Sequence, residues 1–318
     1  RERSGLYVNP DLTEGRVEAR EAERRDSNRA RQWGRRLKGS LPKAQDYQCP
    51  PNWQQYPYPF IEGQFDQSLY PVREWRDASR LALGVREVNQ WAGQTGDLDD
   101  PQLVEQIRTR ILPRRGIQAR PEEILVTVGT QQARALAAEL LVDSTTSVAV
   151  EEPGYPDMRR LLARQGAPLV YQPVDEQGMV EDERLDECQL FYVTPSHQTP
   201  TAVTMSMERR EQLLARASRQ DALIIEDDFE FESNYLNNPH PALHSLDREA
   251  RVIYVSCLTK VLAPGLRLGF MVAPPEVTRE ARKLRQLQVR HPPLNNQRTA
   301  AFFLSQGHYD TFLMHMHK

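Results

Sequence analysis

Residues that can carry out chemistry or bind an anion lie at or just after the ends of three apolar runs in this 318-residue chain. Asp227 closes one such run, and Lys260 and Arg267 follow shortly after the next. Gly129 and Thr130 come directly after an earlier run, where a helix is expected to begin and to leave its first backbone N–H groups free. An amine can form an imine, a carboxylate can hold a proton on a ring nitrogen, and an arginine can bind a phosphate through paired donors. These groups would form one site only if the fold brings them together.

Alternating strands and helices are predicted from about residue 73 onward. Short runs rich in β-branched residues alternate with segments of helical periodicity, a pattern typical of a parallel sheet covered by helices on both faces. The seven predicted strands lie at 124–128, 147–151, 169–173, 190–194, 222–227, 252–256 and 267–273. The predicted helices lie at 73–84, 101–112, 131–142, 207–219 and 276–290, and a further one begins at 295.

The last predicted strand should run antiparallel to its neighbours. Ten residues separate Ser256 from Arg267, whereas a parallel crossover needs a dozen or more. We therefore expect an α/β fold of three layers, α/β/α, with a seven-stranded, mostly parallel sheet whose last strand is reversed.

The carboxyl ends of parallel strands share one edge of a sheet, and open α/β sheets bind their ligands there. Lys260, Asp227, Arg267 and the turn at Gly129 would meet at this edge, and Tyr155 would expose its ring in the turn after the second strand. Each residue alone has an ordinary structural explanation, such as a turn, a helix cap, a packed ring or a solvated lysine. Together they are the groups that pyridoxal phosphate requires: an amine for the Schiff base, a carboxylate for the pyridine nitrogen and donors for the phosphate.

The motifs around these residues resemble a known family. The run SCLTKVLAPGLRLGFMVAP at 256–274 resembles the Schiff-base signature of the fold type I pyridoxal-phosphate proteins, the aspartate aminotransferase superfamily. The set GTQQA, EEPGYP, TPSHQTPT and IIEDDFEFE is similar to that of the MocR-type regulators, in which a GntR-type winged helix is fused to an aminotransferase-like effector domain. The resemblance covers nearly the whole chain.

The resemblance implies a role for each matching position. Lys260 would be the catalytic lysine that forms the internal aldimine, Asp227 the partner of the pyridine nitrogen, and Arg267 the phosphate-binding arginine. The other implied cofactor contacts are Gly129, Thr130 and Gln131 in the phosphate-binding turn, Tyr155 stacked on the cofactor ring, and Cys257 and Thr259 near the phosphate.

Four positions depart from the family pattern. Phe229 stands where the family usually has a tyrosine that bonds the cofactor's phenolic oxygen, and Cys257 replaces a serine or threonine and is a poorer hydrogen-bond donor. Gln94 replaces a tyrosine that reaches across the dimer in many relatives, and Ala202 replaces a glycine. The departures indicate weaker or re-tuned cofactor binding and argue against efficient transamination.

Three regions are expected along the chain. Residues 1–50 would contain the tail of the winged-helix wing and the interdomain linker, 51–290 the large pyridoxal-phosphate domain, and 291–318 the start of a truncated small domain. The charged stretch 14–36 favours a solvated helix or tether, with an arm that touches DNA as the alternative. On this interpretation the chain is a fragment that lacks both the DNA-binding domain and the small-domain arginine for a substrate carboxylate.

Composition excludes several other classes. Forty-one Lys and Arg against 44 Asp and Glu give a net charge of −3, which argues against nucleic-acid binding over the whole surface. No apolar run is long enough to span a membrane, and the start of the sequence lacks a signal-peptide pattern, so a cytoplasmic location is expected. No metal site is expected, because His315 and His317 are spaced i, i+2 and do not share a helix face. Ser196 and His197 lack a hydrolase motif.

The leading hypothesis is a pyridoxal-phosphate-binding, effector-sensing domain of a MocR/GntR-type DNA-binding transcription regulator. It would sense an amine or amino acid by aldimine exchange at Lys260, bind operator DNA only through a winged helix absent from this chain, and form a homodimer. A catalytically active aminotransferase is the alternative, and a cofactor-free dimerisation module is the third possibility.

Overall fold

The computed structural model describes Arg36 and residues 50–58, 67–93, 98–233, 239–258 and 263–317. The chain divides into two units, Arg1–Asp46 and Tyr47–Lys318, and Arg36 is the one residue described in the first. The fold described below is therefore that of the second unit. The predicted tether at 14–36, apart from Arg36, lies outside the described residues, as does Gln94.

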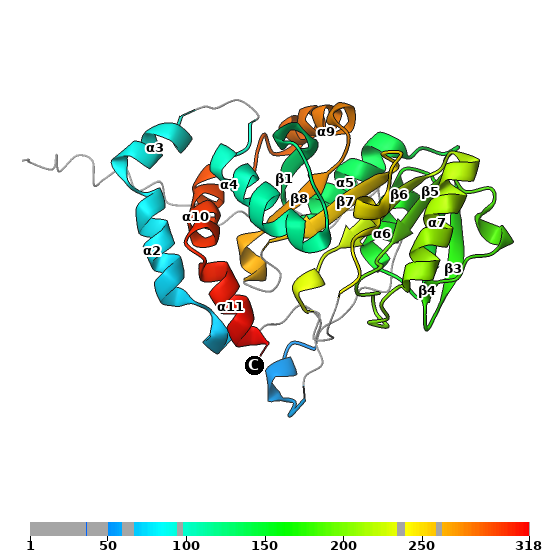
Figure 1. Cartoon of the computed structure of the whole chain (residues 1–318), viewed down its shortest axis with the longest axis horizontal. Helices are drawn as coiled ribbons and strands as arrows, with labels where there is room; N and C mark the ends of the chain where they lie inside the picture. Colours follow the sequence, from blue (N-terminus) through cyan, green and yellow to red (C-terminus); the bar gives the residue numbers. More distant parts are fainter. Residues whose placement is uncertain are drawn as a thin grey trace, which may run out of the picture. The chain divides into compact units, whose positions relative to one another are not determined.

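The described part of the second unit contains an eight-stranded sheet (Figure 1). The strands are β1 Ile124–Val128, β2 Val148–Glu152, β3 Leu169–Asp175, β4 Gly178–Met179, β5 Leu190–Val193, β6 Leu223–Asp228, β7 Val252–Cys257 and β8 Leu268–Val272. Their order across the sheet is β1-β8-β7-β6-β5-β2-β3-β4. Strands β3, β2, β5, β6 and β7 run parallel to one another.

The reversed last strand is confirmed. Strand β8 pairs antiparallel with β7 on one side and with β1 on the other. The seven predicted strands all form, and the structure adds β4, which pairs antiparallel with β3 after a turn at Glu176 and Gln177. A strand of two residues is too short to produce an apolar period, so the sequence pattern could not reveal it.

Helices occur in every predicted helical region, and the structure adds helices at Val85–Trp91, Pro156–Arg164 and Leu243–Leu246 that were not predicted. The helices are α2 Val72–Ala82, α3 Val85–Trp91, α4 Pro101–Gln106, α5 Gly129–Leu141, α6 Pro156–Arg164, α7 Met207–Gln220, α8 Leu243–Leu246, α9 Pro275–Gln288, α10 Leu294–Ser305 and α11 His308–Met316. The helix predicted at 101–112 continues beyond α4 as a wide turn at Ile107–Ile111 and a tight turn at Leu112–Arg115. The helix predicted from 295 is broken into α10 and α11 at Gly307, whose φ is +77°. Among the described residues, no helix combines the length and the apolar character needed to cross a membrane.

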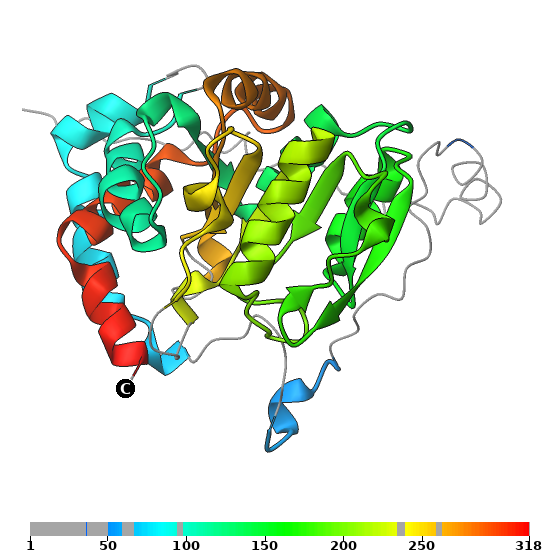
Figure 2. The ribbon, with the colours of Figure 1, turned by 45° about the vertical axis from the view of Figure 1, so that its right-hand side comes forward.

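Helices cover both faces of the sheet, as expected for three layers (Figure 2). On one face, side chains of α5, α6 and α9 pack against β1, β2, β5, β6, β7 and β8. On the other face, α7 and α8 pack over β2, β5, β6 and β7, while α4, α10 and α11 pack over β1, β7 and β8. Both faces of the central strands are therefore buried, which explains their continuous apolar runs.

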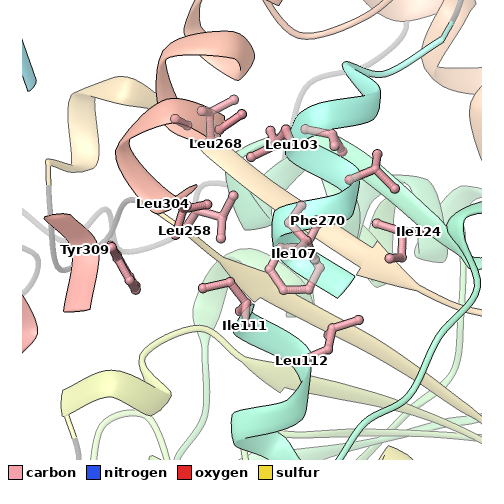
Figure 3. Packing of buried hydrophobic residues seen from close by; sticks show 14 of the residues in the cluster. Leu103, Ile107, Ile111, Leu112, Ile124, Leu258, Leu268, Phe270, Leu304 and Tyr309 are labelled. Atoms are coloured by element: carbon pink, nitrogen blue, oxygen red, sulfur yellow. The ribbon is translucent and has the colours of Figure 1, made fainter. Parts of the chain in front are cut away.

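The cluster of buried hydrophobic side chains beneath α4, α10 and α11 brings together segments that are far apart in the sequence (Figure 3). Leu103 and Ile107 are fully buried and pack with Phe270 of β8 and with Leu304 and Tyr309 from the last two helices. Burying a side chain of this size contributes about 1.5–3 kcal/mol relative to leaving it exposed. Helices α10 and α11 thus share the core of the sheet, and the predicted domain boundary at 290/291 stays a prediction.

Candidate functional site

The turn from β1 into α5 brings Gly129 against Arg267. Gly129 has a φ of +67°, and a Cβ atom added to it would lie 3.3 Å from Cζ of Arg267. Glycine therefore lets the guanidinium lie directly against the first turn of this 13-residue helix. The free N–H groups of a helix N-terminus and a guanidinium both attract anions, so this place is suited to a phosphate.

A second glycine fixes how closely β8 approaches this turn. A Cβ atom added to Gly269 would lie 2.6 Å from the carbonyl carbon of Gly129 and 2.8 Å from the Thr130 nitrogen. Arg267 itself has a left-handed backbone, with a φ of +52°, and an exposed side chain. The backbone of β8 can thus pass the helix start closely while Arg267 remains open to solvent.

Arg134, on α5, connects three of the predicted site residues. Its Cζ atom lies 4.3 Å from the centre of the Tyr155 ring, in a cation–π arrangement. Its Nη1 donates to Oε1 of Gln131 at 3.3 Å, and the Tyr155 hydroxyl lies 3.3 Å from the same oxygen. The guanidinium is buried, so these contacts are shielded from water.

The third residue that Arg134 reaches is Asp227, near the end of β6. Nε of Arg134 donates to Oδ2 of Asp227 at 2.5 Å, and the hydroxyl of Tyr192, on β5, donates to the same oxygen. Burial is the largest cause that raises the pKa of Tyr192 well above its usual value, and the charge of Asp227 adds to it. Oδ1 of Asp227 is buried and, among the described residues, has no hydrogen-bond partner. A buried carboxylate oxygen without a donor is unfavourable, so this atom is open to an N–H group of a ligand.

Glu151, at the carboxyl end of β2, holds the neighbouring loop. Its carboxylate accepts a hydrogen bond from Oγ1 of Thr194 at 2.5 Å, from the Thr194 backbone nitrogen at 3.2 Å and from Nε2 of Gln198 at 3.2 Å. Complete burial raises the pKa of Glu151 to about 7 despite these donors. The loop after β5 is thereby fixed beside the site.

The structure places the predicted site residues as follows. Gly129 meets Arg267 directly, and Gln131, Tyr155 and Asp227 meet through Arg134. Thr130 lies at the second position of α5. Sγ of Cys257 donates to the backbone oxygen of Leu268 at 3.5 Å.

Lys260 and Thr259 lie outside the described residues. Leu258, the last described residue before them, follows β7, which pairs parallel with β6 so that Val255 is level with Asp227. The chain therefore leaves β7 at the sheet edge that carries Asp227.

The sequence interpretation missed Arg134, Tyr192 and Glu151. One signal for Arg134 was present, because residues three apart on a helix share a face and Gln131 is three positions before it. Tyr192 and Glu151 lie inside predicted strands, where nothing in the pattern distinguishes them from packed residues.

The sheet order, with a reversed strand between β1 and β7, is that of an α/β protein of the aminotransferase type. The chain belongs to the aminotransferase class I and II family, whose model matches residues 60–309. It is similar to the structure of an archaeal alanine:glyoxylate aminotransferase, with a TM-score of 0.74 and 29% identity over 80% of this chain and 64% of that one. It is also similar to LysN, the α-aminoadipate aminotransferase of Thermus thermophilus, solved with N-(5'-phosphopyridoxyl)-L-leucine, with a TM-score of 0.72 and 28% identity over 81% and 66% of the two chains.

Curated relatives include transcriptional regulators. The chain is 42% identical to the HTH-type transcriptional regulator TauR of Rhodobacter capsulatus, over 99% of this chain and 65% of TauR. It is 37% identical to the probable rhizopine catabolism regulatory protein MocR of Rhizobium meliloti, over 69% of this chain and 44% of MocR. The predicted resemblance to MocR-type regulators is confirmed, and the chain spans less than two thirds of the length of either relative.

Proposed function

We propose that this chain is the effector-sensing part of a MocR/GntR-type transcription regulator and that it binds pyridoxal phosphate. The observation that carries the cofactor assignment is the buried Oδ1 of Asp227, which has no partner among the described residues. The regulatory assignment is supported by the 42% identity to TauR across nearly all of this chain. The cofactor fits because an acceptor for a ring N–H and a phosphate-binding turn occur in one unit of the fold.

Each residue has a task in this proposal. Arg267 and the first turn of α5 would bind the phosphate, and Oδ1 of Asp227 would accept the N–H of the pyridine ring. Arg134 covers one face of the Tyr155 ring, so the opposite face would be the one to hold the pyridine ring. When bound, pyridoxal phosphate supplies an aldehyde that forms a reversible imine with an amine.

The effector is an amine or amino acid that takes the place of Lys260. Lys260 would hold the aldehyde carbon of the cofactor through a C=N bond, and it would be released as a free amine when an effector amine forms the same bond in its place. Loss of this covalent bond would change which conformation of the domain is favoured. A winged helix outside this chain reads operator DNA, and the whole protein acts in the cytoplasm as a homodimer.

The test is an absorbance titration of the full-length protein with pyridoxal phosphate and then with a panel of small amines. We expect an imine band that changes with one class of amine, and borohydride reduction followed by peptide mapping should place the label on Lys260. Lys260→Ala should lose the band. A label on another residue, or a band unchanged in Lys260→Ala, would overturn the assignment.

A working aminotransferase is the second candidate. It is favoured by the 32% identity to a 2-aminoadipate transaminase of Thermus thermophilus over 60% of this chain. Sustained formation of a new amino acid from a keto acid and an amino donor would support it over a purely regulatory role. A single turnover or none, with effector-dependent DNA binding retained, would support the regulator.

A further inference from the structure

The two carboxylate oxygens of Asp227 have different surroundings. Its Oδ2 already binds a buried cation, Nε of Arg134, at 2.5 Å, and a neutral donor, the hydroxyl of Tyr192. Its Oδ1 is the oxygen left for a ligand, since no described residue bonds it. Any proton donor that binds Oδ1 therefore faces a carboxylate whose charge is already balanced by a guanidinium.

We propose that Arg134 is a positioning residue that fixes Asp227 and Tyr155. Its charge also makes Asp227 less able to stabilise a proton on the ring nitrogen of the cofactor. The proposal rests on the proposed function, because it concerns pyridoxal phosphate bound in this site. Its consequence is a site that exchanges amines readily and removes a substrate α-proton poorly.

The physical reason is the local charge balance. A lone aspartate beside a pyridinium forms a neutral pair, whereas Arg134, Asp227 and a pyridinium together carry a net positive charge. A like charge within about 4–6 Å disfavours the charged form of a titrating group, and a buried site screens this repulsion weakly. The ring nitrogen therefore releases its proton more easily when Arg134 is present.

The other described group that bonds Asp227 carries no charge. Tyr192 contacts the same oxygen as a neutral hydroxyl, because its pKa is far above neutral. Burial likewise raises the pKa of Tyr155, whose ring is held by Arg134, so it too stays neutral. Glu151, whose pKa burial raises to about 7, ionises in the neutral range, but its carboxylate bonds Thr194 and Gln198 of the loop after β5. Arg134 is thus the cation in direct contact with Asp227 among the described residues.

Ring-nitrogen protonation matters differently for the two possible activities. Removing an α-proton leaves electrons that a protonated pyridine ring must accept, whereas imine exchange moves no electrons into the ring. A site that binds the cofactor firmly but protonates its ring incompletely therefore suits a receptor for amines. The arrangement around Arg134 gives a structural basis for separating sensing from transamination.

The experiment uses the full-length protein loaded with pyridoxal phosphate that is isotopically labelled at the ring nitrogen. NMR reports the protonation of that nitrogen as a function of pH without requiring turnover. In Arg134→Gln, which keeps a hydrogen-bond donor and removes the charge, we expect the midpoint to rise by about one pH unit or more. Arg134→Lys, which keeps the charge, should stay close to the wild-type midpoint.

Two further variants keep the test decisive. Tyr192→Phe removes a hydrogen bond from the same oxygen without changing its charge, so its midpoint should move much less than that of Arg134→Gln. If Arg134→Gln does not fold, Arg134→Met replaces it, with the same expected rise. As a second readout, the α-proton of L-alanine should be replaced by deuterium from the solvent faster in Arg134→Gln than in wild type.

The outcomes separate this inference from the proposed function. A bound cofactor, a label on Lys260 and equal midpoints in wild type and Arg134→Gln would overturn the role of Arg134 alone. An equal rise in Arg134→Lys and Arg134→Gln would also overturn it, because charge would not be the cause. Absence of any bound cofactor in wild type and variants would overturn the proposed function, and this inference with it.

Discussion

Asp227 and Asp228 are adjacent in β6, yet each carboxylate is held by a different buried arginine on an opposite face of the sheet. Arg134 binds Asp227 at 2.5 Å, and Nε of Arg115 binds Asp228 at 2.6 Å. The Tyr254 hydroxyl donates to Asp228 at 2.8 Å. Successive side chains of a strand point to opposite faces, so one acid serves the site while the other ties the sheet to the turn after α4.

The pair of Arg115 and Asp228 should be essential for stability. Arg115 is 2% exposed, and besides Asp228 it donates to the backbone oxygen of His240 at 2.8 Å and to Oγ of Ser196 at 2.7 Å. Arg115→Met leaves a buried carboxylate without its cation, and we expect a loss of about 3–5 kcal/mol in the free energy of unfolding, measured with urea. Arg110→Gln, at a half-exposed arginine, should change it far less. Equal effects of the two substitutions would contradict the burial argument.

Gly129 should be required for phosphate binding. In Gly129→Ala the new Cβ lies 3.3 Å from Cζ of Arg267 and the backbone keeps a φ of +67°, which costs an alanine about 1–2 kcal/mol. We expect weaker binding of pyridoxal phosphate and a lower thermal midpoint of unfolding. Gly93→Ala is the matched control, because nothing lies within 4 Å of its added Cβ. Unchanged cofactor affinity in Gly129→Ala would place the phosphate elsewhere.

Glu151 should make stability fall as pH rises. Its folded-state pKa is raised to about 7 by burial, above the ordinary value of 4.5 that holds in the unfolded chain. The stability that the protonated form provides is complete below about pH 4.5 and is lost as pH rises through 7. Between pH 5 and 8, Glu151→Gln should therefore gain about 2–3 kcal/mol relative to wild type in urea unfolding. Parallel pH profiles of the two proteins would show that Glu151 is ionised throughout.

The shared core of α4, β8 and the last two helices should be sensitive to cavities. Leu103 is fully buried among them, and Leu103→Ala should lower the free energy of unfolding by about 2–5 kcal/mol. Leu287→Ala removes the same atoms from a side chain that is 85% exposed, and it should change stability by less than about 0.5 kcal/mol. A small effect of Leu103→Ala would mean that α4 does not pack on the sheet in solution.

The positions of the seven longer strands and the direction in which each runs could be predicted from the sequence, because local sequence features determine them. Both faces of the central strands are buried, so each strand appears as a continuous apolar run. The antiparallel β8 followed from the length of one connection. The break at Gly307 and the irregular turns after α4 were not predicted, because packing of α10 and α11 on the sheet decides them.

The sequence by itself determined the fold class and which residues stand at the ends of the strands, including Asp227 and Arg267. Only the tertiary structure showed that Oδ2 of Asp227 is bound by Arg134, 93 residues away, and by Tyr192, 35 residues away. Apolar periodicity is a property of neighbouring residues and is read along the chain. The charge around a buried carboxylate depends on which distant side chains the packed helices and strands bring to it, and that becomes visible only in three dimensions.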